Sequence, residues 1–154
     1  MLVYLILLYW MSNENEKLEF VVEAARRDFL GFCMVSDQYW QTEPHHELMA
    51  NKLQDVADGK IKRLILMLPP RSGKSRIVQE FCAWYLGKNP NKSIINTGHS
   101  QGLLENFSRL VRDRVNSDMY KLIFPDTKVR DDSSAVDDWK TTTQGTYMIF
   151  GVGA

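Results

Sequence analysis

The residues of this chain best suited to chemistry are Gly73, Lys74 and Ser75, which end the stretch LMLPPRSGKS (residues 66–75). They match the close of the pattern G-x-x-x-x-G-K-[ST], in which backbone N–H groups and a lysine surround phosphate oxygens while a hydroxyl reaches Mg²⁺. Leu68 stands where the pattern has its first glycine, and two prolines follow it. The first question is therefore whether such a loop still holds a phosphate.

The prolines do not remove the phosphate-binding groups. Pro69 and Pro70 have no N–H to donate, but the donors of such a loop come mainly from its later residues and from the following helix N-terminus. No proline occurs from Arg71 to Ser75. The prolines also restrict the loop and lower the entropy cost of ordering it. We therefore predict a phosphate site with Lys74 as its cation and Ser75 as its Mg²⁺ ligand.

Arg71 adds a cation within the loop itself. A guanidinium there is placed to stabilise the charge that develops on a transferred γ-phosphate, as an arginine finger supplied in cis. The alternative is a solvated loop arginine, and both interpretations stay open at this point.

Patterns typical of helices and strands surround the loop. Apolar residues at helical spacing predict a helix over residues 14–32 and a second with Pro44 in its first turn that ends at Gly59. They also predict a helix after the loop, closed by Gly87 and Pro90, and another that carries the stripe Leu103, Phe107, Leu110 and Val111. Leu64–Leu68 is a continuous apolar run and predicts a strand buried on both faces, and Ser93–Thr97 predicts a second strand. Near the end, Trp139–Thr142 and Tyr147–Phe150 flank a turn and predict a hairpin.

This order of elements predicts an α/β domain. We expect a parallel sheet of the P-loop NTPase type with flanking helices, incomplete and with a C-terminal β-hairpin, spanning residues 14–154. A strand before the loop and a helix after it favour a phosphate site over a coincidental S-G-K-S turn.

The N-terminus, residues 1–13, is expected to lie outside the fold. Residues 1–10, MLVYLILLYW, form an apolar run, whereas a membrane span needs about 17–25 residues. Met11 precedes a polar stretch and resembles a natural start. The alternatives are a signal or anchor, or a strand packed on the domain.

Composition favours one ordinary globular domain. The chain has 154 residues, of which 44% are hydrophobic, and its 19 Lys and Arg balance 19 Asp and Glu. Because the charges balance, the chain has no overall positive potential that would attract nucleic acid or an anionic membrane. Any polyanion must therefore bind a local basic patch. Cys33 and Cys82 lie far apart without metal spacing, which favours reduced, buried thiols and a cytosolic protein.

Three blocks of the sequence resemble, in order, the N-terminal ATPase region of phage terminase large subunits, the motors that use ATP to drive double-stranded DNA into procapsids. The blocks are LMLPPRSGKS, AWYLGKNPNKSIINTGHS and DDWKTTTQGTYMIFGVGA, and the similarity runs from about Pro44 to Ala154. The resemblance implies ATP and Mg²⁺ as cofactors, with Arg71 and Lys74 catalytic and Ser75 on the metal. It implies a nucleotide-binding set of Gln41, Arg71, Ser72, Gly73, Lys74, Ser75 and Arg76.

The same resemblance implies that the stretch Gln38–His46 approaches the adenine, which makes Gln41, His45 and His46 candidates for that contact. A solvated first helical turn is the alternative for the two histidines. It further implies double-stranded DNA as a partner, a homo-oligomeric ring with a small subunit and a portal, no membrane, and the cytoplasm of a bacterial host.

One feature of that family is not found in the sequence. An apolar strand ending in an acidic pair, the Walker B site, is expected, but Asp131-Asp132 and Asp137-Asp138 follow no four-residue apolar run. We therefore expect the nucleotide-binding half of an active site without its acidic half, and we find no acidic cluster for a nuclease in these residues.

DNA contacts are only weakly indicated by the sequence itself. Arginines at positions 109, 112 and 114 and basic residues at 60, 62 and 63 form the two candidate groups, with solvated charge as the alternative. Other functions also stay open: a helicase-like translocase, a small-molecule kinase, or a fragment that binds nucleotide without catalysis.

Overall fold

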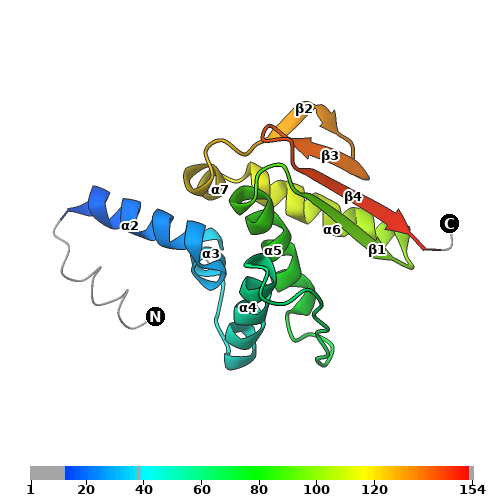
Figure 1. The fold of residues 1–154 in the computed structure, drawn as a ribbon, viewed down its shortest axis with the longest axis horizontal. Helices are drawn as coiled ribbons and strands as arrows, with labels where there is room; N and C mark the ends of the chain where they lie inside the picture. The colour runs from blue at the N-terminus through cyan, green and yellow to red at the C-terminus, as the bar shows by residue number, and fades with distance from the viewer. Residues whose placement is uncertain (1–12, 38, 153–154) are drawn as a thin grey trace.

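The computed structural model describes residues 13–37 and 39–152 and has a mixed α/β architecture (Figure 1). The helices are α2 Glu14–Arg27, α3 Phe29–Ser36, α4 Pro44–Ala57, α5 Lys74–Lys88, α6 Gln101–Asn116 and α7 Asp118–Ile123. The strands are β1 Ser93–Gly98, β2 Val129–Ser134, β3 Asp138–Thr141 and β4 Thr146–Gly151. The predicted α/β class is confirmed. The apolar N-terminal run lies outside the described residues.

The strands form a four-stranded mixed sheet in the order β1-β4-β3-β2. β1 pairs with β4 in parallel, with Ile95 opposite Met148. β4 pairs with β3 in antiparallel fashion, with Tyr147 opposite Trp139. The predicted C-terminal hairpin is therefore confirmed, whereas the parallel part of the described sheet is limited to the β1–β4 pair.

Helix α6 covers one face of this sheet and contacts β1, β4 and β2 (Figure 1). Trp139 and Tyr147 are fully buried on that face, where the Trp139 indole N–H donates to the Ser108 hydroxyl of α6 over 3.0 Å. On the opposite face Ile95 and Phe150 are 60% and 54% exposed. Successive side chains of β1 and β4 point to opposite faces of the sheet, so one face is buried and the other is open to solvent.

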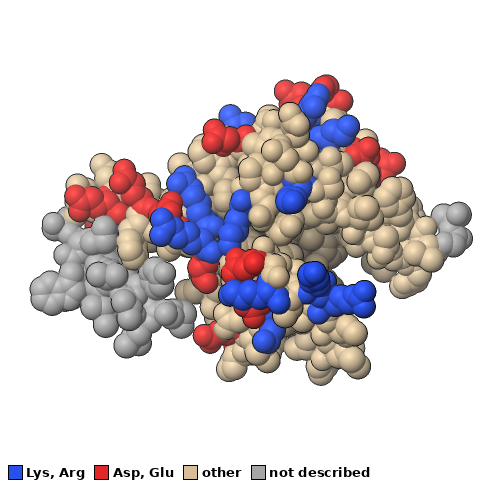
Figure 2. All heavy atoms as spheres, viewed as in Figure 1, with Lys and Arg blue, Asp and Glu red and all other residues tan. Residues whose placement is uncertain are grey.

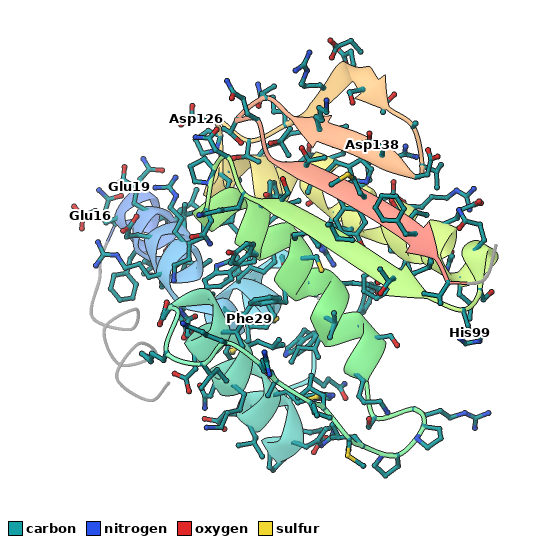
Figure 3. The ribbon with its side chains drawn as sticks, turned by 45° about the vertical axis from the view of Figure 1, so that its right-hand side comes forward. Glu16, Glu19, Phe29, His99, Asp126 and Asp138 are labelled. Atoms are coloured by element: carbon teal, nitrogen blue, oxygen red, sulfur yellow. The ribbon has the colours of Figure 1, made fainter. Side chains whose placement is uncertain are left out.

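Helices α2 to α5 and α7 pack around a second part of the core. Phe29, the first residue of α3 (Figure 3), packs against α5, with its ring 5.4 Å from that of Trp84. Two buried polar groups have partners there: the Trp84 indole donates to the Ala25 carbonyl at 3.0 Å, and the Tyr120 hydroxyl donates to the Ala83 carbonyl at 2.9 Å. Satisfied polar groups of this kind avoid the cost of burying an unpaired donor.

The strand predicted over Leu64–Leu68 is wrong. These residues lie in no strand or helix, and Ile65 and Met67 are 83% and 87% exposed. Leu64, Leu66 and Leu68 are partly buried against the core instead. A strand needs backbone partners, and within the described residues neither edge of the sheet pairs with this segment.

The long helix predicted over residues 14–32 is divided at Asp28. The Asp28 carboxylate accepts a hydrogen bond from the Gly31 N–H at 2.6 Å and so starts α3, while the Asp28 N–H bonds to the Ala24 carbonyl at the end of α2. An aspartate at such a position competes with helix continuation because it caps the next turn. Helix α7 and strand β2 were not predicted from the sequence.

In the described residues no helix is long and apolar enough to cross a bilayer.

Gly87 tests the packing between α5 and the segment after α7. A Cβ at Gly87 would lie 2.4 Å from the ring of Phe124, so we expect Gly87→Ala to lower the free energy of unfolding by about 1–3 kcal/mol. Gly102→Ala is the control, because a Cβ there meets nothing within 4 Å. Urea unfolding followed by circular dichroism measures both, and equal stability of the two variants would contradict this packing.

Candidate phosphate-binding site

The predicted loop leads directly into the N-terminus of α5. Gly73 is the N-cap residue, in the left-handed region with φ 77° and ψ 4°, and no side chain of the described residues caps this helix. Among the described residues, the N–H groups of the first turn therefore have no capping acceptor. Together with the helix dipole, such a terminus favours an anion.

The loop backbone is bent at two positions around Ser72. Arg71 and Gly73 have φ values of 64° and 77°, and left-handed conformation at a non-glycine residue such as Arg71 is uncommon. The Ser72 hydroxyl between them is buried and, among the described residues, has no hydrogen-bond partner. A buried unpaired hydroxyl is costly, and a phosphate oxygen is the kind of group that would satisfy it.

The Lys74 ammonium is bound within the loop itself. Its Nζ donates to the Leu68 carbonyl at 2.6 Å and to the Pro69 carbonyl at 2.9 Å. Both acceptors belong to the Leu-Pro-Pro part of the motif. Because both are backbone carbonyls, the loop backbone itself holds the cation in place.

Two histidines at the start of α4 contact the loop from the other side. The His45 Nε2–H donates to the Ser72 carbonyl over 3.2 Å. His46 accepts a hydrogen bond on Nδ1 from the Glu43 N–H at 3.2 Å, and its Nε2 lies 2.7 Å from the position of a Cβ on Gly73. Glycine is thus required at position 73 both by its φ and by the ring of His46.

A cavity of about 370 Å³ lies between α4 and the loop. Of the sequence-predicted residues, it brings together Gln41, His45, His46, Arg71, Ser72, Gly73 and Arg76. Lys74 and Ser75 are not in its lining: Lys74 is engaged with the loop carbonyls, and Ser75 is exposed at the first turn of α5. The volume is in the usual range for a small-molecule site.

Sequence reasoning missed the aromatic wall of this cavity. Tyr39 and Trp40 line it, and the guanidinium of Arg76 lies 5.5 Å from the centre of the Trp40 ring. The Trp40 indole N–H donates to the Thr42 hydroxyl at 3.0 Å. The adjacent aromatic pair in the stretch before α4 was the available signal, but its proximity to the loop depends on the tertiary fold.

The acidic pairs near the C-terminus do not reach the loop. Asp131 and Asp132 lie on β2, and Asp138 begins β3, on the side of the molecule away from the loop that precedes α5 (Figure 3). Asp132 is paired with Arg130, which lowers the pKa of its carboxyl. Searching residues 13–37 and 39–152 finds no group of three His, Cys, Asp or Glu able to hold a metal ion.

The arginines of α6 are engaged within the chain. Arg109 pairs with Glu105 at 3.3 Å, Arg112 donates to the Ser134 carbonyl, and Arg114 pairs with Glu80 at 2.7 Å. On the face shown in Figure 2, basic side chains form separate groups with acidic ones between them. The local geometry therefore favours the interpretation of these arginines as structural.

No protein-family model, curated protein or solved structure matches this chain in comparisons by sequence and by structure.

Gly73→Ala tests the contact between the loop and α4. The added Cβ collides with the His46 ring and also strains the backbone, so we expect loss of phosphate-ligand binding and lower stability. Gly59→Ala is the matched control, because Gly59 has φ 73° but a Cβ there meets nothing within 4 Å. Calorimetry with tripolyphosphate distinguishes them, and equal effects on binding would exclude a role for the collision.

Proposed function

We propose that this chain binds the phosphates of a nucleoside triphosphate at the loop before α5, as the nucleotide-binding part of a terminase-like DNA-packaging ATPase with a P-loop type of fold. The observation that carries the proposal is the buried, unpaired Ser72 hydroxyl beside the uncapped N-terminus of α5. An anion there satisfies an orphaned donor and the first-turn N–H groups together.

The charges around the loop fit a polyphosphate. Arg71 and Lys74 lie beside Gly73 in the loop, and Arg76, which follows in the first turn of α5, is paired with Asp37. Lys74 exchanges its two carbonyl acceptors for phosphate oxygens when the ligand binds. The ammonium bonds to carbonyls and to phosphate oxygens are both charge-assisted, but only the phosphate oxygens carry negative charge, so the exchange adds an ion-pair attraction that favours the bound state.

Mg²⁺ fits the same site through the exposed Ser75 hydroxyl, which is a hard oxygen ligand. When bound, the ion neutralises charge on the β- and γ-phosphate oxygens. Ser75 would supply one ligand to the ion, and phosphate oxygens and water would supply the others.

The coupling of this site to DNA rests on the ordered sequence blocks that resemble terminase large subunits. On this proposal the partners are double-stranded DNA, further copies of the chain in a ring, a small subunit and a portal, in the cytoplasm of the host. Purification of the chain with double-stranded DNA and a filter-binding assay test the first of these.

A second candidate function is nucleotide binding without hydrolysis by these residues. It is favoured by the position of Asp131, Asp132 and Asp138 on the β2–β3 hairpin, which is remote from the start of α5 (Figure 1). Hydrolysis of ATP needs a carboxylate to help hold Mg²⁺ and a group that orients the attacking water. Phosphate release measured on the purified chain separates the two candidates.

Lys74→Ala is expected to abolish ATP binding while secondary structure stays intact. The substitution removes the loop cation and its bonds to Leu68 and Pro69, and we expect a loss of at least about tenfold in affinity. Lys62→Ala is the control, because Lys62 is an exposed cation shortly before the loop. Calorimetry and far-ultraviolet circular dichroism give both readouts, and unchanged ATP affinity would refute the proposal.

Arg71→Ala separates the two roles open to this arginine. In a form of the protein that hydrolyses ATP, we expect turnover to fall by a far larger factor than ATP affinity, because a transition-state contact acts mainly on kcat. Arg71→Lys retains the charge but not the planar fork, so it should recover only part of the rate. Equal losses in turnover and affinity would assign Arg71 to ground-state binding alone.

A further inference from the structure

Arg76 borders two cavities. It lines the cavity beside the loop and also a second cavity, of about 500 Å³, that lies between α5 and α6. Among the described residues that line these two cavities, Arg76 is the one they share. Its guanidinium donates to Oδ2 of Asp37, the residue that follows α3. A single side chain from the first turn of α5 thus reaches both the loop and the junction of three helices.

Arg114 of α6 is the second cation at this junction. Two of its nitrogens donate to Oε1 of Glu80, at 2.7 and 3.1 Å, and the third donates to the Ser36 carbonyl at the end of α3. Its Nη2 also lies 3.8 Å from Oδ2 of Asp37, the oxygen that Arg76 holds. That separation is an ion-pair contact but is too long for a hydrogen bond, so Arg114 lies beside Asp37 without being bonded to it.

The side chains of this junction differ in exposure. Those of Glu80 and Asp37 are 7% and 12% exposed, whereas that of Arg76 is 48% exposed. Burial acts to raise the pKa of Asp37, but the hydrogen bonds from Arg76 and from the Tyr39 N–H outweigh it and lower the pKa overall, so the carboxyl is charged. A shielded carboxylate needs a cationic partner. Arg76 is therefore the member with room to move, and Arg114 is the cation placed to replace it at Asp37.

An anion in the loop would compete with Asp37 for Arg76. Arg76 lies in the first turn of α5, three residues after Gly73, and its side chain lines the loop cavity. A polyphosphate carries several negative charges and a carboxylate carries one, so phosphates in the loop attract the guanidinium more strongly. Departure of Arg76 would leave Asp37 shielded from solvent and without its hydrogen-bonded cation.

We propose that Asp37 exchanges its arginine when an anion fills the loop, and that this exchange transmits the occupancy of the loop to α6. The inference rests on the proposed function, because it needs an anion at the loop. Without the anion, Arg76 holds Asp37. With the anion, Arg76 turns to the phosphate oxygens and Arg114 closes its 3.8 Å separation from Asp37. One carboxylate with two alternative partners is a two-state element, which coupling between distant parts of a protein requires.

Helix α6 carries the consequence toward the sheet. Arg114 lies in its last turn, and the helix covers the buried face of the sheet through contacts with β1, β4 and β2 (Figure 1). A new bond from Arg114 to Asp37 ties this end of α6 to the end of α3. The last turns of α6 therefore open less often when the loop is occupied, and amide hydrogen exchange measures such opening.

Tripolyphosphate tests the coupling in the full chain. We expect a saturating concentration of this anion to slow amide exchange at the end of α6, residues 111–116, at least about threefold. Asp37→Asn removes the carboxylate with which the phosphates compete. Tripolyphosphate affinity, measured by calorimetry, should therefore rise about two- to fivefold, the range expected for a half-exposed ion pair, while the slowing at α6 is lost.

Arg76→Gln keeps the inference testable if Asp37→Asn does not fold. It leaves Arg114 as the cation for both carboxylates, Asp37 and Glu80. The end of α6 should then exchange slowly without any anion, and tripolyphosphate should slow it no further. Exchange in this variant that is as fast as in the anion-free wild type would contradict the replacement of Arg76 by Arg114.

Asp113→Asn is the matched control. Asp113 lines the second cavity with Asp37, but it is exposed and, within residues 13–37 and 39–152, forms no ion pair. We expect tripolyphosphate affinity and exchange at α6 to stay as in the wild type. Lower tripolyphosphate affinity in Asp37→Asn, or a wild-type chain that binds the anion without slower exchange at α6, would overturn the coupling. A wild-type chain that binds no tripolyphosphate would refute the proposed function itself, and this inference with it.

Discussion

The structure of the site depends on one backbone constraint, the left-handed conformation of Gly73 at the start of α5. Glycine also has no side chain that could cap the helix, so the first-turn N–H groups have no side-chain acceptor at this position. The ring of His46 lies against the glycine and excludes a Cβ, while His45 holds the preceding carbonyl. Lys74 then closes the loop on the carbonyls of Leu68 and Pro69. Each contact acts on an adjacent part of the same turn, so they stabilise it jointly.

Helical packing supplies the rigidity that this turn needs. Helix α5 is held against α3 by the contact between Trp84 and Phe29. Two ion pairs, Arg76 with Asp37 and Glu80 with Arg114, hold its N-terminal half. A buried carboxylate such as Glu80 is costly by itself, and it is tolerated because Arg114 contacts it with two nitrogens. The polar network therefore replaces apolar packing where α3, α5 and α6 meet, and it does so next to the candidate site.

Charged side chains are unevenly distributed along the chain, although its formal net charge is zero. The loop has Arg71, Lys74 and Arg76 within a few residues, whereas a group of aspartates lies on and beside the β2–β3 hairpin. Such separation gives the loop a positive local potential that net charge does not reveal. The sheet, which is open on the face that carries Ile95 and Phe150, contributes no residue to the lining of the cavity.

The sequence by itself determined the loop, helices α4 to α6, strand β1 and the hairpin, because each depends on local spacing, caps and turns. It did not determine the secondary structure of Leu64–Leu68, since an apolar run becomes a strand only where another strand offers backbone partners. Asp28 ended α2 through a cap that was visible in the sequence but weaker than the helical periodicity around it. Only the tertiary structure brought His45 to Ser72 and Asp37 to Arg76, residues 27 and 39 positions apart. Contacts at such separations follow from how helices pack, and no local pattern encodes them.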